Sequence, residues 1–133
     1  MAFVLDNSVA IAWFVNSQAT AYSRRMSVRA ERESLHAPAF WPLEFANSLW
    51  SLEKRKRLRA HEVDGIVVRA ERLGVVLHGE PVPMRVLLEM SRQSGLAVYD
   101  TAYLELAQRF GLPLAAQDAV LRAAARRAGV PVL

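Results

Sequence analysis

A short apolar run that leads directly into an acid constrains the fold of this chain more than any other stretch. Residues 2–5 read Ala-Phe-Val-Leu, and Asp6 follows. An uninterrupted apolar run of this length is typical of a strand buried on both faces of a parallel sheet. In open α/β sheets, ligands bind beyond the carboxyl ends of the strands, where the strand order reverses. Asp6 is therefore a candidate site residue. The alternative is that Asp6 or Ser8 only caps a helix predicted over residues 9–14.

Segments with helical and strand spacing alternate along the rest of the chain, and single Gly and Pro residues separate them. Helices are predicted over residues 9–14, 20–33, 40–58, 62–73, 84–91 and 119–128, with a further helix that follows Asp100 and ends at Gly111. Strands are predicted over residues 2–5, 35–37, 75–78, 112–116 and 130–133. This alternation indicates an α/β fold, a three-layer α/β/α sandwich around a central, mainly parallel sheet. We expect residues 1–133 to form one domain, with all strand ends on one edge.

The composition narrows the classes of function. The chain has no cysteine, which excludes disulfides, thiolate zinc sites and a cysteine nucleophile and fits a cytoplasmic location. No stretch approaches the roughly 20 apolar residues that span a bilayer, so we expect no membrane partner. The apolar share of 53% is slightly high, and an apolar patch that pairs with a second copy would explain it. The net charge of +4 is compatible with a polyanionic partner.

The segment over residues 40–58 is unusual because its apolar residues cover most of a helix circumference. They fall on two sides, one with Leu43, Ala46 and Trp50 and the other with Phe45, Leu49 and Leu52. A helix with two apolar sides is expected to be buried on both of them.

A narrow polar stripe runs between these two apolar sides. It contains Glu44, Asn47, Ser48 and Ser51, at spacings of three, four and seven residues. A buried acid is costly without a partner, and a metal cation or a hydrogen-bond network would supply one. The alternative is that Glu44 only complements the helix dipole, but this does not explain the three polar residues below it.

Two further acids, Asp100 and Asp118, are each predicted to stand just before a helix, as Asp6 is. Each could be a helix cap. Because strand ends share one edge of the sheet, however, we expect the three acids to lie near one another, and carboxylates that cluster repel unless a cation lies between them.

With Glu44 added, the predicted site has four carboxylates, and such oxygen ligands suit Mg²⁺ or Mn²⁺. Zinc would favour clustered histidines, whereas His36, His61 and His78 are scattered in the sequence. We expect His36 and His78, on strands, to be structural residues.

These motifs, taken in order, resemble the PIN domain, and within it the VapC-type toxins of bacterial toxin–antitoxin pairs. The pattern is Val-Leu-Asp6-x-Ser8, Pro42-Leu-Glu44-x-x-Asn47, Tyr99-Asp100-Thr-Ala-Tyr103 and Leu-Ala-x-x-Asp118. It covers essentially the whole chain. The resemblance implies an α/β/α sandwich, a metal-dependent endoribonuclease, a homodimer and an antitoxin that blocks the site. The RNA target stays open, with transfer RNA and ribosomal RNA both plausible.

The resemblance also implies roles for single residues. Asp6, Glu44 and Asp100 match the three core acids, Asp118 matches the fourth, and Ser8 and Asn47 match supporting polar positions. One or two cations held by the acids would activate a water and neutralise charge on the phosphate, leaving 5′-phosphate and 3′-hydroxyl ends.

The chain departs from the family pattern at Ala116. Members usually carry Thr or Ser two residues before the fourth acid. We expect weaker support around the metal site and not a dead site, because all four acids remain.

A basic run follows the polar stripe. It comprises Lys54, Arg55, Lys56, Arg57 and Arg59. Cations suit a helix C-terminus, which makes a solvated helix end one interpretation. The functional interpretation is a surface that contacts RNA phosphates.

Other classes of protein also place acids at strand ends. A haloacid-dehalogenase-type phosphatase would need an acid where Ser8 stands, and a receiver domain would need a lysine after Asp118. The stronger alternative is a non-catalytic RNA- or protein-binding module on the same fold. Ala116 favours that alternative, whereas the four intact acids favour the nuclease.

Overall fold

The centre of the molecule is a four-stranded sheet in which all strands are parallel. The structure is a computed structural model that describes residues 1–133. The strands are β1 (Ala2–Leu5), β2 (Ser34–Pro38), β3 (Val76–His78) and β4 (Leu114–Ala115), in the order β3-β2-β1-β4. Along the chain, β2 is added beside β1 and β3 beside β2, and β4 is then added on the other side of β1. The strand order therefore reverses between β1 and β4.

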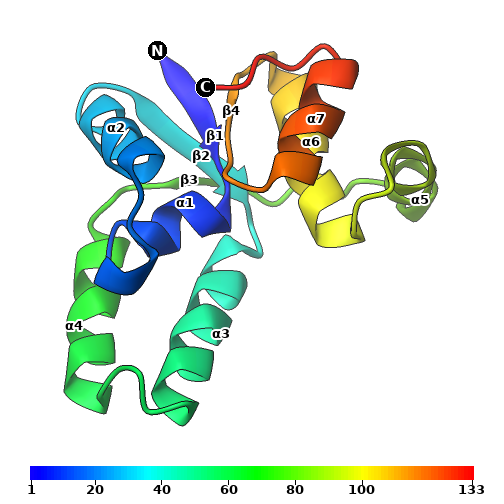
Figure 1. Ribbon diagram of the computed structural model, residues 1–133. Helices are drawn as coiled ribbons and strands as arrows, with labels where there is room; N and C mark the ends of the chain where they lie inside the picture. Colours follow the sequence, from blue (N-terminus) through cyan, green and yellow to red (C-terminus); the bar gives the residue numbers. More distant parts are fainter.

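Seven helices surround this sheet. They are α1 (Asn7–Ala12), α2 (Ala21–Ala30), α3 (Trp41–Lys54), α4 (Ala60–Glu71), α5 (Met84–Ser94), α6 (Val98–Phe110) and α7 (Ala119–Arg127). Figure 1 shows α2 on one side of the sheet and α6 and α7 on the other, while α3 and α4 project from the sheet as a pair. The predicted α/β/α architecture is confirmed. None of the helices combines the length and the apolar composition that crossing a membrane requires.

The first strand lies in the middle of the core. Phe3, Val4 and Leu5 are fully buried, because helices cover both faces of the sheet and β2 and β4 flank β1 on either side. This burial explains why residues 3–5 are apolar without alternation. It also fixes the position of the residue that follows them, Asp6.

The prediction that the 40–58 helix is buried on two sides is wrong. Phe45 and Leu49 are buried, but Leu43 is 71% exposed and Trp50 is 52% exposed. Only one apolar side of α3 packs in the chain, and the other faces solvent. The helix also ends at Lys54, before the predicted end at Leu58, because the backbone of Lys56 turns into the left-handed region with φ of 58°.

Two smaller predictions also need correction. Residues 130–133 form no strand and contribute a single bridge, in which Val132 pairs with Leu114. In addition, α6 starts at Val98, so Asp100 lies inside the first turn of the helix and not before it. The reason is that Gly95, with φ of 75°, ends α5, and the extended Ala97 already caps the next helix.

Candidate active site

Asp6 lies at the carboxyl end of β1, beside the reversal in strand order. Its Oδ2 accepts hydrogen bonds from the Ser8 amide at 3.2 Å and from the Ser8 hydroxyl at 2.5 Å. Asp6 is therefore the N-cap of α1. An N-cap side chain can remain solvent-exposed while it caps a helix, whereas Asp6 is only 6% exposed. This burial goes beyond what capping requires.

Burial raises the pKa of Asp6 from 3.8 to about 6. The hydrogen bonds from Ser8 oppose this change, while the charges of Asp100 and Glu44 add to it. The charged form of Asp6 is thus disfavoured both by lost water and by neighbouring acids. A cation near these carboxylates would relieve both effects.

Glu44, in the first turn of α3, is held by a residue from α6. The Tyr103 hydroxyl donates a hydrogen bond to Glu44 Oε1 at 2.6 Å. Tyr103 is 0% exposed, and burial together with this bond keeps the pKa of its hydroxyl far above its usual range, so it remains a donor. Burial raises the pKa of Glu44, the bond from Tyr103 lowers it, and Asp100 raises it. The polar stripe on α3 therefore faces α6 at this point.

Tyr103 was not among the residues predicted for the site. It lies one turn after Asp100 on α6, and its spacing with Leu106 and Ala107 marks it as a core residue. The signal that could have identified it is its hydroxyl, since a buried tyrosine normally needs a hydrogen-bond partner. Phe40 packs edge-on against the Tyr103 ring at 5.7 Å and fixes its orientation.

The other two acids come from the amino ends of α6 and α7. Burial raises the pKa of Asp100, and the charge of Asp118 raises it further. Asp118 is exposed and accepts a hydrogen bond from the Val120 amide at 3.1 Å, as the N-cap of α7. Asp6 follows β1 and Asp118 follows β4, its parallel neighbour, so both lie at one edge of the sheet. The charge of Asp100 raises the pKa of Asp6 and of Glu44, as expected for acids that share this edge.

Of the two predicted supporting residues, only Ser8 contacts an acid. Asn47 is exposed, and its side chain makes no hydrogen bond. Asn7 takes the linking position instead, because its Nδ2 donates to Ser48 Oγ at 3.1 Å and the Ser48 hydroxyl donates to the Glu44 carbonyl oxygen at 3.1 Å. This chain of bonds ties the start of α1 to the start of α3.

Ala116 is fully buried at the end of β4, and its neighbours supply polar groups that its own side chain lacks. The Ala116 amide donates to the Tyr22 hydroxyl at 3.2 Å. The Gln117 amide group donates from Nε2 to the Ser8 carbonyl oxygen at 3.1 Å and accepts at Oε1 from the Thr20 hydroxyl at 2.7 Å. These bonds hold the loop before Asp118 against α1 and α2.

The donor set fits a hard divalent cation. It consists of carboxylate oxygens, and none of the four acids forms an ion pair with a lysine or arginine. As the side chains stand, no three carboxylates or imidazoles approach closely enough to share one metal ion. The cluster therefore carries carboxylates that no cationic side chain of the protein pairs with.

Most of the chain, residues 3–127, matches the family description of the PIN domain. The chain belongs to the PIN-domain family. Ribonuclease VapC3 of Pyrobaculum aerophilum is 26% identical over 120 residues, which cover 89% of this chain and 90% of that protein. The crystal structure of PAE2754 from Pyrobaculum aerophilum has a TM-score of 0.67 at 22% identity and covers 93% of this chain and 84% of that one. The predicted family and fold are both confirmed.

The basic run of this PIN domain lies away from the acids. It forms the turn between α3 and α4, at the end of the projecting pair in Figure 1, where Lys54, Arg55, Lys56, Arg57 and Arg59 are all exposed. Glu44 and Lys54 are ten residues apart on one helix, which corresponds to about 15 Å along its axis. The fold therefore separates the basic run from the acid cluster.

Two histidines of the PIN domain that are distant in sequence meet at the edge of the sheet. His36 Nδ1 and His78 Nε2 are 2.8 Å apart, whereas the ring centroids are 5.1 Å apart, so the rings meet edge to edge. Such a bond needs one protonated and one unprotonated nitrogen. His36 and His78, which are scattered in the sequence, are thus neighbours in the fold. Their direct hydrogen bond is consistent with the predicted structural role.

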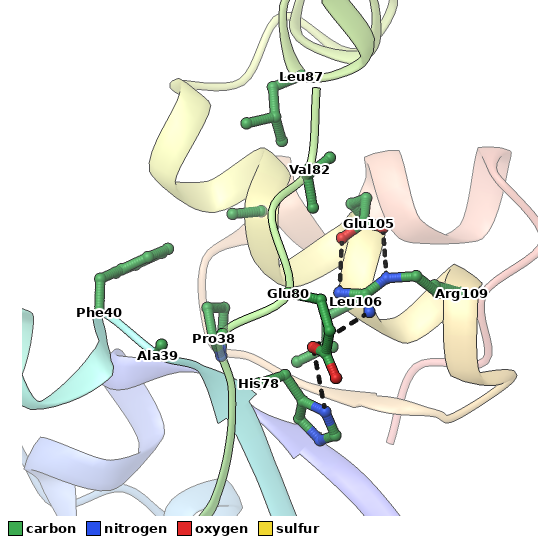
Figure 2. A pocket seen from close by; sticks show the side chains of 12 residues that line it. Pro38, Ala39, Phe40, His78, Glu80, Val82, Leu87, Glu105, Leu106 and Arg109 are labelled. Atoms are coloured by element: carbon green, nitrogen blue, oxygen red, sulfur yellow. Dashed lines mark hydrogen bonds and ion pairs between the residues drawn. The ribbon is translucent and has the colours of Figure 1, made fainter. Parts of the chain in front are cut away.

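His78 also borders a pocket of about 290 Å³ that lies between the end of β3 and α6 (Figure 2). Arg109 pairs there with Glu105 at 2.7 Å and with Glu80 at 3.5 Å, and Glu80 lies 3.9 Å from His78. None of the four acids lines this pocket. It is therefore distinct from the candidate active site.

Because the pKa of His36 is lowered, we expect the protein to lose stability as the pH falls. Burial and the neighbouring His78 lower the pKa of His36, so its contribution to stability is present above the unfolded pKa of about 6.5 and is lost as the pH falls through the lower folded value. We expect the free energy of unfolding of the wild type, relative to His36→Gln, to fall between about pH 7.5 and pH 5.5. Urea unfolding measures it, and His61→Gln on the exposed side of α4 is the control. A difference that does not change with pH would contradict this expectation.

Proposed function

We propose that this chain is a divalent-metal-dependent endoribonuclease and the toxin of a VapC-type toxin–antitoxin pair. The observation that carries the proposal is the acid cluster at the reversal of strand order, in which four carboxylates have no cationic partner. Membership of the PIN-domain family supports it, as does the similarity to Ribonuclease VapC3 over most of both chains.

The residues of the cluster have separate roles in this proposal. Asp6, Glu44, Asp100 and Asp118 would hold Mg²⁺ or Mn²⁺, which supplies an activated water and neutralises charge on the scissile phosphate. Ser8 orients the Asp6 carboxylate through two hydrogen bonds, and Tyr103 holds Oε1 of Glu44. These contacts keep the acids in place before RNA binds.

The proposed partners are RNA, a cognate antitoxin and a second copy of the chain. Exposed apolar side chains on α3 and α5, namely Leu43, Trp50, Met84 and Leu88, suit protein partners. The basic turn between α3 and α4 suits RNA phosphates at a distance from the cut. An RNA-cutting toxin with these partners would act in the cytoplasm.

A non-catalytic binding module is the second candidate, and two observations favour it. The acids do not converge on one point as the side chains stand, and Ala116 lacks the usual hydroxyl. This candidate predicts RNA or protein binding without cleavage.

Cleavage of total RNA separates the two candidates. We expect the wild type to produce discrete fragments with Mg²⁺ or Mn²⁺ and none with EDTA, and sequencing of the fragment ends gives the cut sites. Asp6→Ala and Asp100→Ala should lose this cleavage, while Asp64→Ala, on the exposed side of α4, should retain it. Fragments that are the same for all proteins and conditions would favour the binding module.

A further inference from the structure

A second pocket lies beside the acid cluster and has the opposite charge. Its volume is about 350 Å³, and Thr20, Tyr22, Ala116, Gln117 and Arg122 line it. These residues come from the start of α2, the loop after β4 and the first turns of α7. No acidic side chain lines the pocket.

Two guanidinium groups meet at the ring of Tyr22. The Arg122 guanidinium carbon lies 5.0 Å from the ring centroid, and that of Arg25, from α2, lies 5.7 Å from it. Neither arginine forms an ion pair with an acid. The ring therefore gathers two guanidinium groups, and neither of them pairs with an acidic side chain.

Arg122 is held in a fixed orientation. Its Nη1 donates to the carbonyl oxygen of Ala116 at 2.8 Å and to the main-chain oxygen of Leu133, the last residue of the sequence, at 3.0 Å. The remaining donors, on Nε and Nη2, make no hydrogen bond to the protein. An arginine that is anchored by one nitrogen and free at two others is suited to a tetrahedral oxyanion, which can accept two parallel hydrogen bonds.

Gln117 connects this pocket with the acid cluster. Its side chain lines the pocket, bonds to Thr20 and also bonds to the carbonyl oxygen of Ser8, whose hydroxyl donates to Asp6. Asp118 is the next residue in the chain. Arg122 thus lies within a few hydrogen bonds of Asp6 and Asp118, and Arg25 meets it at the Tyr22 ring.

We propose that this pocket binds a backbone phosphate of the RNA strand that flanks the phosphate being cut. The inference rests on the proposed ribonuclease function. A cluster of unpaired carboxylates repels a polyanion, so a strand that enters it needs positive charge close by. The basic turn between α3 and α4 is at the far end of a helix, whereas Arg122 lies in the first turn after Asp118 and shares the Tyr22 ring with Arg25.

Binding of single-stranded RNA in EDTA tests the pocket without cleavage. The probe is a fluorescently labelled, mixed-sequence RNA of about 20 nucleotides, titrated over a range of salt concentrations. The variant is Arg25→Gln, on the exposed side of α2, and the matched control is Arg24→Gln, the neighbouring exposed residue with the same charge change. Removing one phosphate contact should reduce the slope of log affinity against log salt by about 0.7, which corresponds to about fivefold weaker binding at 0.1 M salt.

The control variant should bind as the wild type does, because the guanidinium groups at the Tyr22 ring are those of Arg25 and Arg122 and not that of Arg24. Arg122→Gln should weaken binding at least as much as Arg25→Gln, provided that circular dichroism shows it folded. In cleavage assays with Mg²⁺, Arg25→Gln should raise KM and leave kcat unchanged, since the contact is the same before and during reaction.

Two results would overturn the proposal, and they have different meanings. If the wild type cleaves RNA but Arg25→Gln and Arg24→Gln have equal slopes, the pocket binds no phosphate and the proposed function stands. If the wild type neither binds nor cleaves RNA, the proposed function fails and the pocket proposal fails with it.

Discussion

Replacement of Asp6 by asparagine is expected to abolish RNA cleavage and at the same time to stabilise the protein. Loss of a carboxylate from the acid cluster should reduce cleavage at least about 100-fold. Folding raises the pKa of Asp6 from 3.8 to about 6, which means that its charge costs the folded state about 3 kcal/mol at neutral pH. Asparagine removes this charge and still caps α1, so we expect a gain of about 2–3 kcal/mol at pH 7 without divalent cation.

The dependence of this gain on pH provides the control. Because the folded pKa is raised, the wild type is free of the cost at a pH below 3.8, and the cost grows as the pH rises through about 6. Urea unfolding in EDTA should therefore show the largest difference between Asp6→Asn and wild type near neutral pH and little difference near pH 4. Asp64→Asn, an exposed acid on α4, should leave both stability and cleavage unchanged. A lower free energy of unfolding for Asp6→Asn than for the wild type at pH 7 would contradict the inference that burial of the charged Asp6 carboxylate destabilises the fold.

Replacement of Tyr103 by phenylalanine is expected to weaken Mn²⁺ binding by about 10- to 100-fold, because the hydroxyl that orients Glu44 is lost. The hydrogen bond from Tyr103 lowers the pKa of Glu44. Without it the carboxyl should stay protonated to a higher pH, and the pH below which Mn²⁺ binding is lost should rise. Isothermal titration calorimetry over a pH series measures both effects.

Tyr99→Phe is the matched control for this variant. Tyr99 packs edge-on against Phe40 at 5.4 Å, much as Tyr103 does at 5.7 Å, but its residue is 62% exposed and its hydroxyl bonds to no acid. We expect it to bind Mn²⁺ with the affinity of the wild type. Equal losses in the two variants would indicate that the aromatic packing, and not the hydroxyl, matters for Glu44.

The general fold could be predicted because its signals are local. The apolar run before Asp6 predicts a central strand, and the alternation of periods predicts the parallel sheet. The burial of α3 could not be predicted in the same way. The sequence of a helix with two apolar sides does not tell whether the second side packs within the chain or faces solvent. In α3, Leu43 and Trp50 on that second side are exposed to solvent.

The contacts between residues distant in the sequence depend on how the strands pair and where the helices leave the sheet. A single sequence does not reveal this register. Glu44 and Tyr103 are 59 residues apart and meet because α3 and α6 leave the sheet at the same edge. His36 and His78 meet because Ala37 pairs with Leu77 in the β2–β3 ladder. A shift of one residue would turn one histidine to the opposite face of the sheet. The kinds of residue at the site were predictable, but these pairings were not.

The position of β4 in the sheet determines when, during synthesis and folding, the acid cluster can form. β4 is the last of the four strands in the sequence, yet its neighbour in the sheet is β1, the first. During synthesis, which proceeds from the N-terminus, Asp6 and Glu44 emerge early, but they cannot meet Asp118 until β4 and Asp118 have left the ribosome. Truncated or stalled chains that end before β4 therefore lack the complete cluster. The four acids can therefore act together only after β4 has joined the sheet.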